Sequence, residues 1–267
     1  MVVVIKGAGD IASGIATRLY RSGFQIIMTD IENPTSIRNT VCFSQAIVNG
    51  ETEIENIKAV KAENFDEALS IINSGDIAVI IDERAEIVKE IKPSVVVDAI
   101  LAKKNLSTSI NDADLVIAVG PGFTAKVDCD VVIETMRGHN MGRVIYEGTA
   151  LENTGVPGFV GGKSGERIIR ATKDGEFRPV KKIGDMVKEG EIVAYVDEEP
   201  VLAYTSGVVR GMLNEGIKVY KGMKSGDVDP RGNIDYCYTC SDKALAIGGG
   251  VLEAILAFQK ENLWKMM

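Results

Sequence analysis

The chain has 267 residues, of which 45% are hydrophobic and 25% are charged, and its formal net charge at neutral pH is −8. This balance is typical of a globular protein, and the acidic charge argues against a nucleic-acid partner, which requires a basic face. No apolar run approaches the roughly 20 residues that span a bilayer, and the four cysteines are expected to be thiols in a cytoplasmic protein.

The first thirty residues carry the most specific motif. An apolar strand over residues 2–6 runs directly into the sequence GAGDIA, and helical spacing follows over residues 11–21. This is G-x-G-x-x-A between a strand and a helix, which predicts a dinucleotide-binding turn. Gly7 permits the tight turn, Gly9 leaves room for a pyrophosphate, and Ala12 allows the helix to pack close to the strand.

Two acidic residues bear on what this turn binds. A strand over residues 24–29 ends at Asp30, where a carboxylate accepts hydrogen bonds from a ribose and favours NAD over its 2′-phosphorylated form. Asp10 lies inside the motif and places a negative charge beside the predicted phosphates. Both are included in the predicted cofactor-binding set, and the identity of the ligand is left open.

Strands and helices then alternate to about residue 150. Helices are predicted over residues 35–48, 65–73 and 83–91, and strands over residues 57–62, 77–81, 94–97 and 115–119. This order predicts an α/β fold, with a Rossmann-like parallel sheet as a nucleotide-binding domain over residues 1–150. Arg38 and Asp98 are candidates for the ligand-binding edge of the sheet. Their alternatives are a solvated arginine and a helix N-cap.

A loop after the strand over residues 115–119 holds the candidate catalytic residues. A Gly-Pro-Gly turn adds Gly120 and Gly122 to the cofactor-binding set. Cys129 follows, with Arg137 and His139 a few residues later. We predict that these three act together, because a neighbouring cation lowers the pKa of a thiol and favours the reactive thiolate. The alternative is a small core cysteine and a structural histidine.

The second part of the chain contains an internal repeat. The pattern G-x-x-V-x-x-G occurs over residues 184–190 and again over residues 216–222. This spacing resembles the barrel-sandwich hybrid of biotinyl and lipoyl carrier domains, so a small all-β module is expected over residues 151–236. The stretch DEEPV at residues 197–201 has no lysine where a carrier has one. A structural or docking role is therefore expected instead.

The tail, residues 237–267, is predicted to form a helix that packs back on the first domain. Within that helix Gly248, Gly249 and Gly250 each cost about 1 kcal/mol relative to alanine, so they require close approach of another backbone or a ligand. Cys237 and Cys240 form a C-x-x-C pair. It is a redox pair, part of a zinc site or a pair of structural thiols, and no metal site is predicted.

Several motifs together resemble the YqeB family, the accessory proteins of the selenium-dependent molybdenum hydroxylase system. They lie at residues 7–14, 119–122, 127–129, 134–143, 229–232 and 242–255. The resemblance implies a cytoplasmic factor linked to the maturation of those enzymes through selenium or the molybdenum cofactor, and with the glycine motif the expected ligand is an NAD-like dinucleotide or a molybdopterin nucleotide. Its implied partners are that small molecule, a molybdenum hydroxylase subunit and a second copy of the chain. The alternatives are an NAD-dependent oxidoreductase and a non-catalytic docking scaffold.

Overall fold

The computed structural model describes residues 1–266, with side chains described through residue 261. The chain forms two compact units. The first comprises Met1–Pro34, Phe43–Thr154 and the residues from Cys240 on, and the second comprises Thr35–Cys42 and Gly155–Thr239. Within the described residues, no helix combines the length and the apolar character that crossing a membrane requires.

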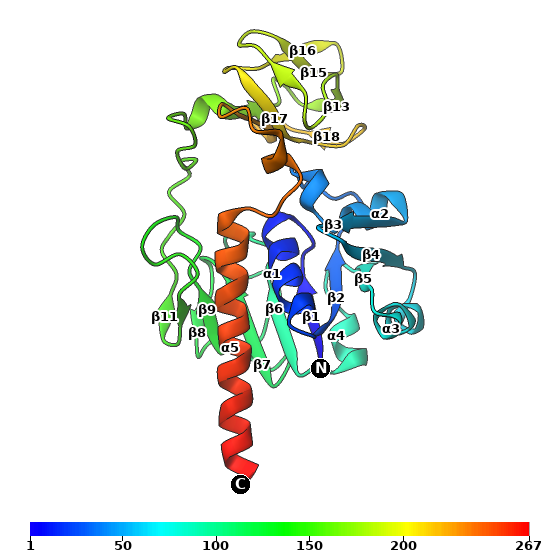
Figure 1. The fold of residues 1–267 in the computed structure, drawn as a ribbon, viewed down its shortest axis with the longest axis vertical. Helices are drawn as coiled ribbons and strands as arrows, with labels where there is room; N and C mark the ends of the chain where they lie inside the picture. Colours follow the sequence, from blue (N-terminus) through cyan, green and yellow to red (C-terminus); the bar gives the residue numbers. More distant parts are fainter. Residues whose placement is uncertain (267) are drawn as a thin grey trace. The chain divides into compact units, whose positions relative to one another are not determined.

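A nine-stranded sheet forms the centre of the first unit (Figure 1). Its spatial order is β10-β9-β7-β6-β1-β2-β5-β4-β3. The strands are β1 (Val2–Lys6), β2 (Gln25–Asp30), β3 (Glu51–Ile54), β4 (Ile57–Ala62), β5 (Ile77–Ile81), β6 (Val95–Asp98), β7 (Leu115–Val119), β9 (Val131–Ile133) and β10 (Val144–Ile145). Six neighbouring pairs are parallel, and the β3–β4 and β9–β10 pairs at the two edges are antiparallel. Strands β8 (Thr124–Ala125) and β11 (Gly148–Thr149) form a separate small ribbon.

The central strands are continuous apolar runs because both of their faces are covered. Helices α3 (Phe65–Ser74) and α4 (Ile87–Ile91) pack with Val4 of β1 and Val96 of β6 in one hydrophobic cluster. Helix α3 begins at Asn64, whose side chain accepts a hydrogen bond from the Glu67 backbone amide, as an N-cap does. The short helix α2 (Gln45–Asn49) precedes strand β3.

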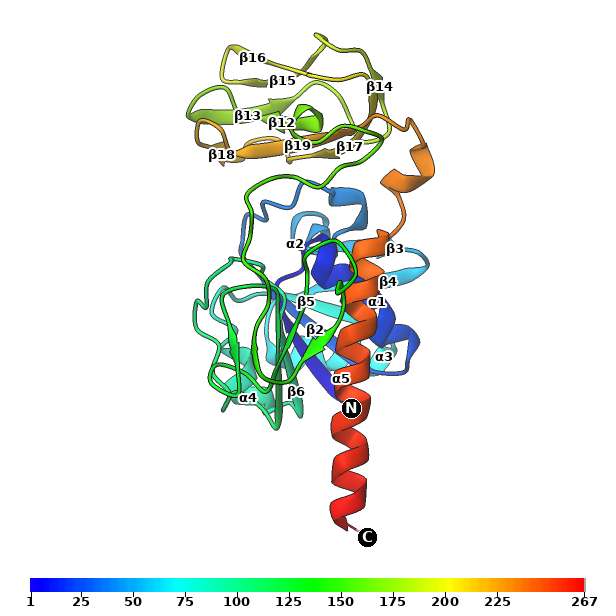
Figure 2. The same ribbon diagram turned by 90° about the vertical axis from the view of Figure 1, so that its left-hand side faces the viewer.

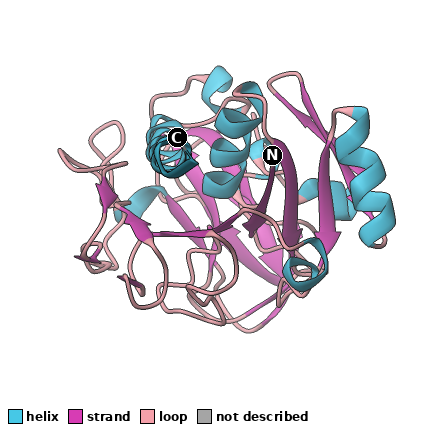
Figure 3. Cartoon of the chain, turned by 90° about the horizontal axis from the view of Figure 1, so that it is seen from below, coloured by secondary structure: helices cyan, strands magenta, loops and turns pink. Residues whose placement is uncertain are grey.

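Helix α1 (Asp10–Arg21) and the 25-residue helix α5 (Asp242–Met266) lie side by side (Figures 1, 2 and 3). Their contact requires small residues. A Cβ added to Gly14 would lie 2.5 Å from the Cβ of Ala244, and one added to Gly248 would lie 3.0 Å from the carbonyl oxygen of Gly14. The prediction that the glycines of α5 permit close backbone approach is confirmed at Gly248 and at Gly250, where an added Cβ would lie 2.1 Å from the Gly142 carbonyl oxygen, whereas Gly249 faces open space.

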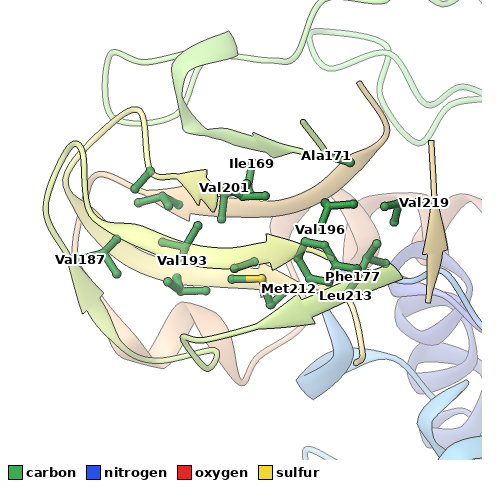
Figure 4. Close-up of a cluster of buried hydrophobic side chains, with 14 residues drawn as sticks. Ile169, Ala171, Phe177, Val187, Val193, Val196, Val201, Met212, Leu213 and Val219 are labelled. Atoms are coloured by element: carbon green, nitrogen blue, oxygen red, sulfur yellow. The ribbon is translucent and has the colours of Figure 1, made fainter. Parts of the chain in front are cut away.

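The second unit contains two four-stranded antiparallel sheets. Their spatial orders are β12-β19-β17-β14 and β16-β15-β13-β18. The strands are β12 (Ile168–Arg170), β13 (Gly175–Pro179), β14 (Met186–Val187), β15 (Ile192–Val196), β16 (Glu199–Leu202), β17 (Gly207–Met212), β18 (Lys218–Val219) and β19 (Lys224–Asp229). Three 3-10 turns also belong to it, namely Asn39–Val41, Gly165–Arg167 and Ile234–Cys237. Figure 4 shows the apolar core, in which Phe177 and Val196 are fully buried.

The two copies of the internal repeat occupy matching places in these sheets. Strand β14 is an edge of one sheet and β18 is an edge of the other. The glycines that begin and end each copy all have a positive φ, between +81° and +98°. The valine between them is buried in both copies, Val187 in the first and Val219 in the second. The pattern therefore specifies a buried edge strand between two turns that favour glycine.

Residues 35–42 belong to the second unit and not to a helix of the first. Arg38 forms a parallel bridge with Met212, and the Met212 amide donates to the Ile37 carbonyl at 2.6 Å. The guanidinium of Arg38 is buried and donates to the carbonyls of Tyr236 and Thr239. The prediction of a helix over residues 35–48 is therefore wrong for its first half, because pairing with distant residues replaces the local helix.

The predicted fold class, a Rossmann-like parallel sheet followed by a barrel-sandwich module, is wrong in that form. The large sheet is mixed, because β3 and β10 add antiparallel edges. No helix lies between β6 and β7 or between β7 and β9. The second unit takes a separate segment, residues 35–42, from the first part of the chain, so it is not one continuous carrier-like module.

Candidate functional site

The carboxyl ends of β1 and β6 form the point where the order of the sheet reverses. From β1 the chain continues to β2 and β5 on one side, whereas β6 is followed by β7 and β9 on the other. Ligands of open α/β sheets settle in the crevice at such a point. Lys6 ends β1, Asp98 ends β6, and the two are paired across the strands.

Lys6 is a buried amine at this point. Its residue is 3% exposed, and its Nζ donates to the Thr108 hydroxyl at 2.7 Å. That hydroxyl in turn donates to Asp98 Oδ2 at 2.6 Å. The carboxylate oxygen Oδ2 of Asp112 lies 3.7 Å from the Lys6 Nζ, within ion-pair distance. A buried ammonium requires such partners, because removing a charge from water is costly.

The loop between β6 and Thr108 contains two residues in a strained backbone conformation. Leu101 and Lys103 both have positive φ angles, +62° and +63°, which residues other than glycine rarely adopt. Asn105 holds the end of the loop, since its amide group donates to the Thr108 carbonyl and its oxygen accepts from the Thr108 amide, both at 2.8 Å. Such strain is concentrated at binding sites, where the surrounding contacts sustain it.

A cavity of about 500 Å³ lies beside Lys6. This volume is within the range of small-molecule sites. The lining residues come from β1, the loop after β5, helix α4 and the loop after β6: Lys6, Glu83, Arg84, Ala85, Glu86, Val88, Lys89, Leu106, Ser107 and Asp112. Three of them are cationic and three are acidic.

The residues of the glycine motif are held by contacts within the chain. A Cβ added to Gly7, whose φ is +92°, would lie 3.1 Å from the Ala99 carbonyl oxygen. Asp30 accepts from the amide of Ala8 at 2.9 Å and from that of Ile31 at 2.8 Å, so both of its oxygens are engaged. Burial raises the pKa of this carboxyl, against the effect of the two amides. These contacts stabilise the turn itself, and because each carboxylate oxygen can accept a second hydrogen bond, the ribose contact of Asp30 stays a prediction.

Gly9, Asp10 and Ala12 lie at the start of α1. Gly9 is the N-cap and Asp10 is in the first turn, where its negative charge is favourable near the amino end of the helix. Ala12 is buried, as its predicted packing role requires. No ligand contact tests the binding role of these residues, which stays a prediction.

Cys129 has the surroundings of a core residue. Its residue is 0% exposed and packs with Val116, Phe123 and Val132. Burial, together with the charges of neighbouring carboxylates, raises the pKa of the thiol to about 12. The thiol therefore holds its proton at neutral pH, which argues against the predicted nucleophile.

Of the other predicted site residues in this region, Arg137 and Gly122 make contacts within the chain. Arg137 forms a bidentate pair with Asp242 at 2.6 and 3.0 Å, and His139 is exposed. Gly120 and Gly122 have positive φ angles. A Cβ added to Gly122 would lie 2.6 Å from the backbone of Lys104, so this glycine permits two loops to approach each other.

The cysteines do not supply a metal site. Cys42, Cys129, Cys237 and Cys240 are all buried free thiols. Burial raises the pKa of Cys237, and it raises that of Cys240 to about 11. Among the residues whose placement is described, no group of three or more histidine, cysteine, aspartate or glutamate residues is arranged to hold a metal ion.

Sequence reasoning missed two lysines. Lys6 was not singled out, although a charged residue that directly ends a buried apolar strand is an unusual arrangement. Lys243, in the first turn of α5, was also missed. Burial lowers the pKa of its amine, and the charge of Arg137 lowers it further. Asp98 was named as a rim acid, and it does lie at the end of β6.

Comparison with known proteins gives one close sequence relative. No protein-family model matches the chain. The chain is 50% identical over 262 residues to an Escherichia coli protein described as "Uncharacterized protein YqeB". The match covers 98% of this chain. The chain spans about half the length of that relative, 48%, and the relative's description names no activity.

Similar solved structures are more remote. An aspartoacylase family protein from Mesorhizobium loti is 11% identical, with 85% of this chain and 84% of that chain covered and a TM-score of 0.27. A succinylglutamate desuccinylase from a Silicibacter species is 12% identical, with the same coverage and a TM-score of 0.24. A succinylglutamate desuccinylase/aspartoacylase from Rhodobacter sphaeroides is 24% identical over 32% of this chain and 29% of that chain, with a TM-score of 0.23. At these TM-scores no fold or activity is transferred to this chain.

The structure corrects the predicted function. The Cys129 thiol, which was predicted to be reactive, is buried and holds its proton, so a maturation role that uses it is wrong. The Rossmann and barrel-sandwich assignment is wrong as well, because the large sheet has antiparallel edges and the second unit is built from two separate segments.

Proposed function

We propose that the first unit binds a small molecule bearing an anionic group, held in the cavity beside Lys6. The observation that carries the proposal is the buried amine of Lys6 in the wall of a cavity at the reversal point of the sheet. An ammonium group offers three donors, and Thr108 accepts one of them. We expect the other N–H donors of the Lys6 ammonium to bind the anionic group of the ligand.

The surroundings of Lys6 favour binding over a purely structural role. A strand that begins with half-buried Val2 and three buried apolar residues is stabilised most simply by a fifth apolar side chain, since replacing buried ion pairs by well-packed hydrophobic residues is often neutral or stabilising. Here the chain retains the lysine and surrounds it with Thr108, Asp98 and a strained loop. A buried charge and strained backbone both cost free energy, and such costs are typical of functional sites.

The proposal is tested by thermal shift with a panel of small carboxylates and phosphates. A ligand that binds only the folded state stabilises it by about 2.7 kcal/mol at a concentration of 100 times its Kd. We expect at least one compound to raise the Tm of the native chain, and Lys6→Met to remove that shift. Lys58→Met is the matched control, because Lys58 lies on β4, away from the cavity, and forms an ion pair with exposed Glu51.

Two results contradict the proposal. One is a panel in which no compound changes the Tm of the native chain. The other is a shift that Lys6→Met preserves in full while the variant remains folded by circular dichroism. Because methionine fills nearly the volume of the lysine stem, loss of folding is not the expected effect of this substitution.

A further inference from the structure

The balance of charge in the cavity points to a narrower ligand class. We infer that the ligand is a zwitterion of the α-amino acid type, whose carboxylate meets Lys6 and Arg84 and whose amine meets Asp112 and Glu83. This inference rests on the proposed small-molecule site and specifies its occupant.

Two of the six charged lining residues neutralise each other. Lys89 and Glu86, three residues apart at α4, form an ion pair, and this pair shifts the pKa of the Glu86 carboxyl downward. The cavity is then left with two cations and two acids. A ligand with only negative charge would meet the carboxylates of Asp112 and Glu83 as well as the two cations, whereas a zwitterion satisfies charges of both signs.

The remaining charged groups are available to a ligand. Arg84 and Glu83 are exposed, and among the described residues neither has an ion-pair partner within 4 Å. Asp112 is bound only partly by the chain. Its Oδ2 accepts from the Ser109 amide at 3.1 Å, and its side chain remains 25% exposed.

Lys6 and Asp112 place opposite charges at neighbouring points of one wall. Their charged atoms lie 3.7 Å apart, which is an ion pair but longer than an ordinary hydrogen bond of about 2.7–3.2 Å. Each atom therefore keeps capacity for a short hydrogen bond to another group. The carboxylate and the amine of an α-amino acid are attached to one carbon, so they reach two such neighbouring points at once.

The rest of the lining fits an aliphatic or small polar side chain. Val88 and Ala85 are buried apolar residues, Leu106 is a half-exposed apolar residue, and Ser107 adds a hydroxyl. A cavity of about 500 Å³ holds a molecule of amino-acid size with room for water.

The test is a matched series of ligands on the full chain. The twenty protein amino acids are first compared by thermal shift, and the tightest is then compared by calorimetry with its deaminated acid and its decarboxylated amine. We expect at least one amino acid to bind, and each analogue to bind at least tenfold more weakly.

Two variants locate the amine subsite. Asp112→Asn preserves the acceptor for the Ser109 amide but removes the charge, so we expect it to weaken amino-acid binding at least tenfold and to leave binding of the deaminated acid unchanged. Asp114→Asn is the control, because Asp114 is exposed, lies two residues away and does not line the cavity.

The outcomes separate this inference from the proposal beneath it. If a deaminated acid binds as tightly as its amino acid, or if Asp112→Asn weakens both equally, the zwitterion is refuted and the anion site stands. If no amino acid binds but a simple carboxylate or phosphate does, the zwitterion is likewise refuted and the anion site stands. If nothing in either panel binds, both are refuted.

Discussion

Replacing Gly250 in helix α5 by alanine tests the helix packing of the first unit. A Cβ at this position would lie 2.1 Å from the carbonyl oxygen of Gly142, about 1.2 Å closer than a usual carbon–oxygen contact of about 3.3 Å. The neighbour is backbone, so it cannot rotate away as a side chain does. The backbone of α5 or of the Gly142 turn must move.

The magnitude follows from two opposing effects. Alanine is favoured over glycine in a helix interior by about 1 kcal/mol. Overpacking costs about 1–3 kcal/mol and more where the neighbour is rigid. We expect Gly250→Ala to lower the free energy of unfolding of the first unit by about 2 kcal/mol. The control is Gly249→Ala, where nothing lies within 4 Å of the added Cβ, and a gain of about 1 kcal/mol is expected.

The assay is thermal unfolding followed by far-UV circular dichroism, with hydrogen exchange of the α5 amides to assign the transition. A domain of 150–250 residues shifts by about 2–4 °C per kcal/mol, so a gap of 3 kcal/mol between the two variants corresponds to about 6–12 °C. Equal Tm values for the two variants would refute the packing argument, since both carry the same change in helix propensity.

Two further predictions concern buried titratable groups. Because burial raises the pKa of Cys129 to about 12, we expect no reaction of this thiol with iodoacetamide at pH 8 in the folded protein and full reaction in urea; labelling of Cys129 in the folded state, detected by peptide mass spectrometry, would contradict its burial. Burial lowers the pKa of Lys243, so between that lowered pKa and its usual 10.5 the unfolded state binds more protons and stability rises with pH. We therefore expect Lys243→Met to raise the Tm at pH 7 and to flatten the rise toward pH 10.5, whereas exposed Lys104→Met leaves both unchanged; an unaltered pH profile for Lys243→Met would rule this out.

Local patterns in the sequence were enough to predict several elements of the first unit. The apolar run Val2–Lys6 and the helix after Gly9 were placed correctly, because a buried strand and an amphipathic helix each have their own spacing of apolar residues. The strands Ile77–Ile81 and Leu115–Val119 were found with the same bounds. Strand Glu51–Ile54 was missed, since its polar edge sequence has no apolar run.

The candidate site was not accessible to the same reasoning. Lys6 and Thr108 are 102 residues apart, so their hydrogen bond leaves no mark in local spacing. Cys129 was predicted to be reactive because it lies near a turn. The side chains packed around it come from separate strands and exclude water from its thiol. A pKa depends on burial and on neighbouring charges, both of which are set by the fold.

The amino-acid sequence by itself determined the strand after Met1, the glycine turn, the repeated glycine pattern of the second unit and the need for close packing at the glycines of α5. These are consequences of backbone freedom and apolar periodicity within a few residues. Only the tertiary structure decided that residues 35–42 join the second unit, that the sheet has antiparallel edges, and that Lys6 lies in the wall of a cavity. Each of these depends on pairing between distant segments, whose free energy is shared by residues that no local pattern connects.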